Sequence, residues 1–211
     1  MSGGAAGAGV VAGAGAGAGV VAGGLAARLA ARIALNAGRA RWPRVVFIDG
    51  RSGSGKTTLA DGLAAELVRS GCPAPQVVGM DELYPGWDGL AAGSAAVAGL
   101  LRTGVYRRYD WYAETFTPEV VLDLAAPIII EGCGSLSAAA LGAASGLGAP
   151  AGLGASYAVW VECPAPLRRA RALARDGETF APHWENWASQ EAAHFAVSQP
   201  LARVNEIVHV A

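Results

Sequence analysis

The segment from Val45 to Ala60, VVFIDGRSGSGKTTLA, decides the fold of this 211-residue chain. It opens with the apolar run VVFI, whose β-branched and aromatic side chains are typical of a buried strand. A turn rich in glycine follows, and the residues from Lys56 to Ser70 then carry apolar side chains at helical spacing, with Gly71 as the stop signal. The segment therefore predicts a strand, a turn and a helix in immediate succession.

The turn at residues 50–57, GRSGSGKT, matches the pattern G-x-x-x-x-G-K-[ST]. Glycines allow successive backbone N–H groups to point inward around an anion, and the N-terminus of the following helix adds its dipole. In this pattern the lysine reaches the β- and γ-phosphates and the hydroxyl binds magnesium. We therefore expect a site for ATP with Mg²⁺, in which Lys56 is catalytic and Thr57 is a metal ligand. The residues expected to bind ATP are Gly50, Ser52, Gly53, Ser54, Gly55, Lys56, Thr57 and Thr58.

The composition excludes other classes of function. The formal net charge of −1 gives no overall attraction for nucleic acid or for anionic lipid, so we expect neither as a partner. Lys56 is the only lysine among the 16 basic residues, which singles it out chemically. The three cysteines form no C-x-x-C pair, and we expect a reducing, cytoplasmic location. The three histidines show no spacing typical of metal ligands.

The N-terminal region divides into two parts. Residues 1–24 are almost wholly Gly, Ala and Val, and we expect a disordered tail, because the stretch lacks the basic region that precedes a secretory signal. Residues 25–40 predict an amphipathic helix, since Leu25, Leu29 and Ile33 recur at helical spacing. Residues 41–211 are expected to form the main domain.

Further strands follow at 76–80, 127–132, 157–163 and 206–210. Helical segments are expected at about 88–102, after Pro164 and at about 184–196, and a glycine-rich loop is expected before the strand at 157–163. This alternation predicts an α/β fold of three layers, α/β/α, around a parallel five-stranded sheet. Ligands of such sheets bind at the carboxyl ends of the strands. Asp81 and Glu131 both fall at such ends.

These two carboxylates suggest different roles. Glu131 ends the buried run IIIE and is the expected second ligand of magnesium, although it could also be a carboxylate that merely caps a strand. Asp81 is the candidate to orient or deprotonate an acceptor hydroxyl.

Arginines supply the positive charge that phosphoryl transfer needs. Arg168, Arg171 and Arg175 share one face of a predicted helix, for which an arginine-rich solvated helix is the alternative interpretation. The segment 105–118, VYRRYDWYAETFTP, shows no clear hydrophobic period. Its residues could either bind a small-molecule acceptor or serve only in packing. Trp184 and Trp187 are interpreted as core residues more than as ligand contacts. The expected acceptor-binding residues are Tyr84, Arg107, Arg108, Tyr109 and Asp110.

With these residues the chain resembles the P-loop kinase group, which includes uridine, pantothenate and nucleoside-monophosphate kinases, and it is most similar to uridine-kinase-like proteins. The resemblance spans about Arg44 to Val210. DELY at 81–84 resembles the Asp-x-x-Tyr acceptor motif of that family, IIIEG its third strand, and LRRARALARDG at 167–177 the arginine-bearing helix that enters the lid. The resemblance implies a P-loop NTPase fold of the kinase type with a lid around 168–185.

For the site, the resemblance implies that Asp81 is the catalytic base, that Tyr84 lies near the acceptor, and that Arg171 or Arg175 lies over the phosphates. Two features depart from the family pattern. The hairpin that encloses the base in such nucleoside kinases is not identifiable, and WENWASQE at 184–191 has no counterpart.

The sequence thus predicts a kinase that transfers the γ-phosphoryl group of ATP to a small molecule, first of all a nucleoside or nucleotide. A regulatory ATPase without a small-molecule acceptor and a P-loop protein without catalysis are the alternatives. A homodimer is compatible with all three.

Overall fold

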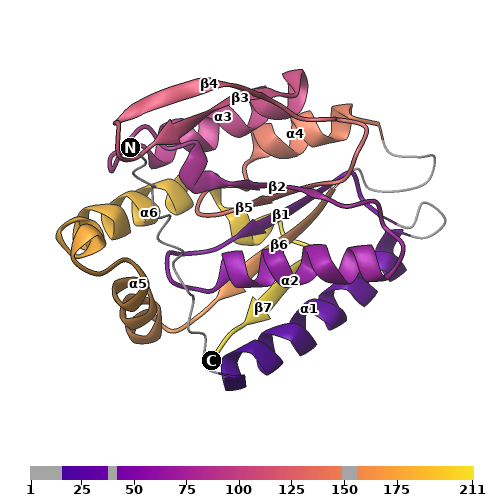
Figure 1. Ribbon diagram of the computed structural model, residues 1–211, viewed down its shortest axis with the longest axis horizontal. Coiled ribbons are helices and arrows are strands. Elements are labelled where there is room, and N and C mark those ends of the chain that lie inside the picture. The colour runs from indigo at the N-terminus through magenta and orange to yellow at the C-terminus, as the bar shows by residue number, and fades with distance from the viewer. Residues whose placement is uncertain (1–15, 38–41, 149–155) are drawn as a thin grey trace, which may run out of the picture.

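The computed structural model describes residues 16–37, 42–148 and 156–211. Its centre is a parallel sheet of five strands in the order β2-β5-β1-β6-β7, shown in Figure 1. The strands are β1 (Val45–Asp49), β2 (Gln76–Gly79), β5 (Ile128–Glu131), β6 (Ser156–Glu162) and β7 (Glu206–His209). The five-stranded parallel sheet expected from the sequence is confirmed.

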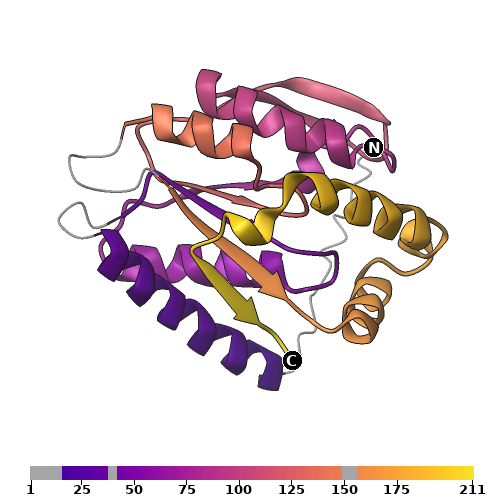
Figure 2. The same ribbon diagram turned by 180° about the vertical axis from the view of Figure 1, so that it is seen from behind.

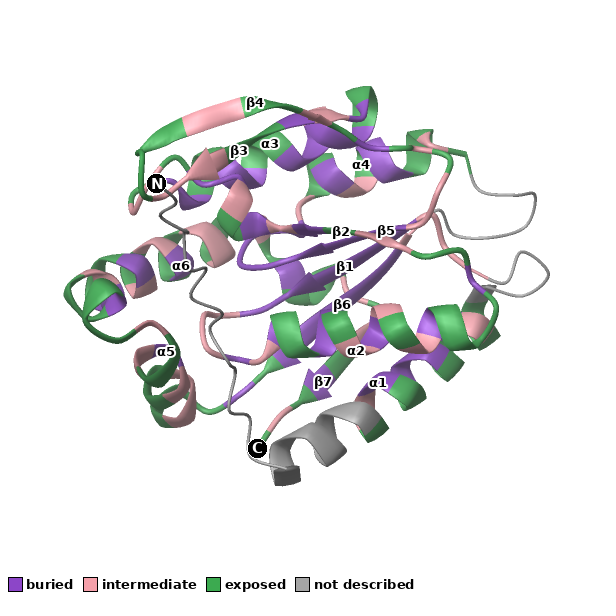
Figure 3. Ribbon diagram, in the orientation of Figure 1, coloured by how far each residue is buried: buried purple, intermediate pink, exposed green. Residues whose placement is uncertain are grey.

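Helices cover both faces of the sheet, because side chains along each strand alternate between the faces. Val46 and Ile48 of β1 pack with α1 (Ala16–Ala37) and α2 (Lys56–Arg69). Val45 and Phe47 belong to a second cluster on the other face. That cluster includes residues of α3 (Leu90–Thr103), α4 (Ala138–Gly146) and α6 (Trp184–Ser198). Figure 3 shows the central strands β5, β1 and β6 as a buried layer between the helices, which confirms the α/β/α arrangement.

Helix α1 differs from the helix expected over residues 25–40. It begins at Ala16 and ends at Ala37, so that residues 16–24 are helical although a disordered tail was expected for 1–24. The glycines at 17, 19, 23 and 24 disfavour a helix, but α1 gains stability by packing along α2 and beside β7 (Figures 1 and 2). Residues 1–15 of the expected tail lie outside the described residues. Within the described ranges, none of the helices combines the length and the apolar character that crossing a bilayer requires.

A β-hairpin occupies the segment in which the sequence shows no clear period. Strands β3 (Val105–Asp110) and β4 (Thr115–Val121) pair antiparallel and form a separate two-stranded sheet. The register shifts between Arg107 and Tyr109, and this bulge interrupts the alternation by which a strand is recognised. A hairpin after the Asp81 motif is therefore present, contrary to the interpretation of the sequence.

The remaining helical segments lie at the carboxyl edge of the sheet. A 3₁₀ turn, η2 (Met80–Glu82), follows β2 directly and carries Asp81. Helix α5 (Ala165–Phe180) is interrupted at Gly177, which has φ 55° and ψ −134°. Two further 3₁₀ turns, η3 (Ala181–His183) and η4 (Pro200–Ala202), flank α6.

Candidate active site

The glycine loop between β1 and α2 lies against the first turns of α5. Gly53 has φ +75°, in the left-handed region that favours glycine. A Cβ atom there would lie 2.1 Å from the carbonyl oxygen of Arg168, so no larger residue fits without moving the backbone. The Arg168 guanidinium in turn donates to the carbonyl oxygen of Ser52 at 3.1 Å. The helix that begins the predicted lid therefore touches the phosphate loop directly.

Asp49 links the start of the phosphate loop to the segment that follows β5. It ends β1, is fully buried, and accepts hydrogen bonds from the backbone N–H groups of Gly50, Gly134 and Leu136 at 2.7, 2.9 and 3.0 Å. Burial raises the pKa of Asp49 to about 6, while these amide hydrogen bonds act in the opposite direction. Asp49 was not predicted as a site residue, although a carboxylate that ends an apolar strand just before the loop could have indicated it.

Lys56 is buried at the start of α2 and donates from Nζ to the carbonyl oxygen of Arg51 at 2.9 Å. Burial opposes its charge, but the neighbouring Cys133, Glu131 and Glu191 outweigh that effect and raise its pKa above the ordinary value. The ammonium group therefore stays positive inside the loop, as phosphate binding requires.

The two residues expected to bind magnesium lie together. The Thr57 hydroxyl donates to Oε1 of Glu131 at 3.0 Å, and Thr57 itself is exposed. Burial raises the pKa of Glu131, whereas Lys56 lowers it. Hydroxyl and carboxylate oxygens are hard ligands that fit Mg²⁺, which normally completes its shell with phosphate oxygens and water. The described residues include no group of three or more His, Cys, Asp or Glu side chains that could hold a metal ion.

A cavity of about 500 Å³ opens beside the loop. Its wall contains Asp81 from η2, Ser52 from the phosphate loop and Arg175 from α5. The rest of the wall is largely aromatic and is formed by Tyr84, Trp87, Trp111, Asp176, Thr179, Phe180 and Trp187. The volume lies within the range of small-molecule sites.

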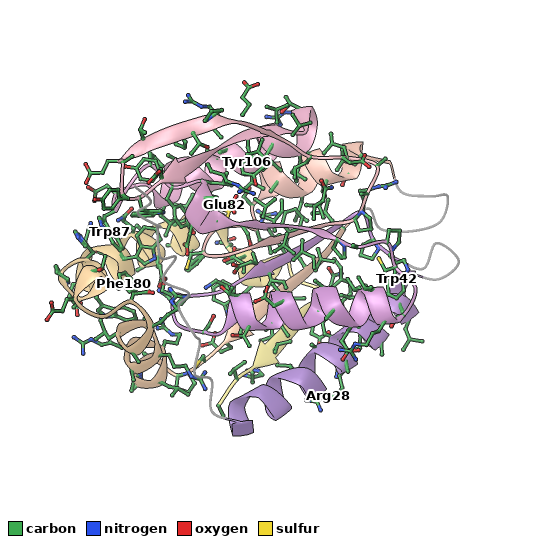
Figure 4. All side chains as sticks on the ribbon, viewed as in Figure 1. Arg28, Trp42, Glu82, Trp87, Tyr106 and Phe180 are labelled. Carbon is green, nitrogen blue, oxygen red and sulfur yellow. The ribbon has the colours of Figure 1, made fainter. Side chains whose placement is uncertain are left out.

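The aromatic side chains connect the loop after β2 to α5 and α6. The Trp87 ring stacks on Phe180 at 5.4 Å and on His183 at 4.2 Å between ring centroids. Figure 4 shows Trp87 and Phe180 close together where α5 and α6 lie. Trp187 is buried, as expected for a core residue, but it also lines the cavity. Trp87 and Phe180 were not predicted, because their contacts join segments far apart in the chain.

Asp81 keeps solvent contact through the cavity. The protein atoms that surround it on most sides raise its pKa, whereas Lys56 and Arg175 lower it. The Trp111 indole N–H donates to the backbone carbonyl oxygen of Asp81 at 2.8 Å and ties the hairpin to η2. A carboxylate in the cavity wall with a pKa above its ordinary value is suited to accept a proton from a bound hydroxyl group.

The expected acceptor residues have different surroundings. Tyr84 lines the cavity, and its hydroxyl donates to the carbonyl oxygen of Cys133 at 2.7 Å. Arg107 donates to the carbonyl oxygens of Phe116 and Thr117 across the hairpin, each at 2.8 Å. Arg108 pairs with Glu82 at 2.9 Å. Arg107 therefore stabilises the hairpin and Arg108 links the hairpin to η2, and neither lines the cavity in this structure.

The other two expected acceptor residues also serve the hairpin. The Asp110 carboxylate accepts from the backbone N–H groups of Tyr112 and Ala113 in the turn, both at 2.9 Å. Tyr109 packs edge-on against Trp111 and Phe116. Of the three consecutive residues Tyr109, Asp110 and Trp111, only Trp111 lines the cavity.

The three arginines of α5 reach different places. Arg168 contacts the loop, and Arg175 lines the cavity while it pairs with Asp176 at 2.7 Å. Arg171 donates to Cys163 Sγ at 3.6 Å and to the carbonyl oxygen of Ala211 at 3.4 Å. In this conformation Arg171 therefore points to the C-terminus, whereas Arg175 lines the cavity.

No protein-family model and no curated protein matches this chain. Among solved structures, it is similar to a possible uridine kinase from Bacillus stearothermophilus, with 20% identity and a TM-score of 0.50 over 79% of this chain and 88% of that chain. It is also similar to a protein described as a fructose transport system kinase from Silicibacter sp. TM1040, with 20% identity and a TM-score of 0.49 over 86% and 98% of the two chains. The first likeness shows that this chain has the fold of the P-loop kinases.

Proposed function

We propose that this chain is a phosphotransferase that uses ATP and Mg²⁺ to phosphorylate a hydroxyl group of a small molecule. The observation that carries the proposal is that Ser52 of the phosphate loop, Asp81 and Arg175 line the same cavity. A nucleotide on the loop and an acceptor in the cavity would thus meet between a candidate base and a positive charge. Proximity of this kind is the main contribution of enzymes to phosphoryl transfer.

Each residue then has a defined task. Asp81 takes the proton of the acceptor hydroxyl as the new bond between oxygen and phosphorus forms and the bond to the departing ADP oxygen breaks. Lys56 and Arg175 stabilise negative charge on the transferred group. Thr57 and Glu131 would hold Mg²⁺, whose chemistry is to neutralise charge on the phosphate oxygens.

The cavity wall favours an acceptor with a flat or partly apolar portion, because tryptophan and phenylalanine rings form much of it. A nucleoside or nucleotide meets this requirement. The solved structure described as a possible uridine kinase shares the fold, so uridine is the first acceptor to test.

The test is acceptor-dependent release of ADP from Mg·ATP, measured with uridine, other nucleosides, nucleoside monophosphates and pantothenate. Lys56→Ala should abolish turnover and greatly weaken nucleotide binding, because it removes the buried positive charge of the loop. Tight ATP binding with full activity in that variant would overturn the assignment.

Hydrolysis that no metabolite changes but a protein partner stimulates would instead identify a regulatory ATPase.

A further inference from the structure

Helix α6 places a buried carboxylate directly on the phosphate loop. Glu191 is 1% exposed, and its Oε1 accepts a hydrogen bond from the backbone N–H of Ser52 at 2.6 Å. Its Oε2 lies 3.4 Å from the guanidinium of Arg51, the residue before Ser52. Backbone N–H groups of this loop are the donors on which the motif depends for binding phosphate. A carboxylate therefore already occupies one of them.

Glu191 also lies close to the catalytic lysine. The Cys133 thiol donates to Glu191 Oε1 at 3.2 Å and accepts from Lys56 Nζ at 3.6 Å, so a single sulfur atom bridges the two charged groups. Since Lys56 is the residue expected to reach the β- and γ-phosphates, the terminal phosphate of a bound triphosphate would lie within Coulombic reach of Glu191.

The helix holds this carboxylate in place. Trp187, one turn before Glu191, is buried in the wall of the acceptor cavity. The Gln190 side chain donates to the carbonyl oxygen of Trp87 at 2.7 Å and accepts from the backbone N–H of Leu90. Because its neighbours on α6 are anchored in this way, Glu191 has little freedom to withdraw when an anion arrives.

We propose that Glu191 is a specificity-determining residue of the phosphate loop, whose fixed negative charge selectively weakens the binding of nucleoside triphosphates relative to diphosphates. The γ-phosphate brings additional negative charge to the side of the loop where Glu191 accepts from Ser52. Arg51 offsets part of the repulsion, but its side chain is one-third exposed at 34%, and solvent screens the pair. The inference rests on the proposed function, because it presumes that the loop binds nucleotides.

The test compares the affinities of Mg·ADP and of Mg·AMP-PNP, a non-hydrolysable triphosphate, by calorimetric titration of the same preparations. Glu191→Gln keeps the shape of the side chain and an oxygen that can accept from Ser52, but it removes the charge. It should tighten AMP-PNP binding by about tenfold, the order of effect of one charge in a partly buried site, and change ADP binding by less than about threefold. Glu185→Gln, an exposed position on the same helix, is the control and should change neither affinity.

Arg51→Gln is the second variant and should act in the opposite direction, because it leaves the Glu191 carboxylate without its partner. An unchanged ratio of the two affinities in both variants, or equal weakening of both nucleotides in Glu191→Gln, would show that Glu191 serves the fold alone and would overturn the inference. If Glu191→Gln does not fold, Arg51→Gln decides the question by whether it weakens the binding of AMP-PNP more than the binding of ADP. A wild-type protein that binds neither nucleotide would instead refute the proposed function itself.

Discussion

Under the proposed function the carboxylate of Asp81, which lines the cavity, takes the proton of the acceptor. Asp81→Asn keeps the size of the side chain and removes the base. We expect kcat for phosphoryl transfer to fall by about 10²–10⁴-fold, the usual contribution of general base catalysis, while the affinity for ADP stays unchanged. Steady-state kinetics and ADP titration of the same variant measure the two effects.

The pH dependence adds a second criterion to this prediction. Because its surroundings raise the pKa of Asp81, the base becomes protonated at a higher pH than an ordinary aspartate does. The rate should therefore decline on acidification at correspondingly higher pH in the wild type, and this decline should be missing from the residual activity of Asp81→Asn. Glu119→Gln, an exposed carboxylate on β4, is a control that should behave as wild type. Normal turnover in Asp81→Asn would remove Asp81 from the mechanism.

Glu131→Gln tests the expected magnesium ligand. The amide retains the shape of the side chain and can still contact Thr57, but it carries no charge for a cation. We expect the Mg²⁺ concentration for half-maximal activity to rise by roughly ten- to a hundredfold, the range seen when a residue that supports a metal is changed. A magnesium titration at saturating ATP provides the measurement. An unchanged requirement would mean that Glu131 only caps β5.

Sequence reasoning identified single residues where the signal is local. The loop from Gly50 to Thr58 is defined by spacing within one turn, and Thr57 and Glu131 do lie together. Glu191 was not predicted, because its partner Ser52 lies 139 positions away in the chain. Arg107 and Arg108 resembled ligand residues in the sequence, since nothing local shows that the hairpin provides the partners of Arg107 and that Glu82 of η2 pairs with Arg108.

At the level of elements, long apolar runs were predictable and polar or small-residue segments were not. The central strands β1 and β5 are buried throughout and consist almost wholly of apolar residues. Helix α4 was not predicted because its sequence, AAALGAASG, contains no charged residue and a single polar one, Ser145, so that no exposed side is marked. Strand β4 is largely exposed and contains Pro118, so it shows no alternation of buried and exposed residues.

Helix α5 carries the element-level prediction. Its interruption at Gly177 provides a point at which residues 178–183 can move relative to the first part of the helix. Arg175, just before that point, lines the cavity and is exposed on 59% of its side-chain surface. Arg175→Ala should lower kcat by about a hundredfold or more with a smaller change in ATP affinity, because its charge is needed as the transition state develops.

Kinetics and direct ATP titration of the Arg175→Ala protein separate these two effects. Arg169→Ala, an exposed residue of the same helix, is the matched control and should keep normal kcat. Since the pair between Arg175 and Asp176 lies on the surface, stability should hardly change. A normal kcat in Arg175→Ala would show that this arginine is a solvated helix residue, as the alternative interpretation of the sequence has it.

At the scale of the whole molecule, the cavity residues and the residues of α1 lie on opposite faces of the sheet. The cavity residues Tyr84, Phe180 and Trp187 belong to the core cluster on one face. The residues of α1 belong to the cluster on the other face, where they cover α2 and β6. A defect deep in the second cluster should therefore affect folding more than turnover.

Ile33→Ala tests this separation. Ile33 is 0% exposed on α1, and its truncation leaves a cavity against the sheet that should lower the free energy of unfolding by about 2–5 kcal/mol. Leu35→Ala, on the same helix but 82% exposed, should change it by less than about 0.5 kcal/mol. Urea denaturation measures both values, and kcat per folded molecule at 25 °C should match the wild type in each, because neither residue contacts the cavity wall. A loss of kcat in Ile33→Ala without a loss of stability would show that α1 takes part in the geometry of the active site.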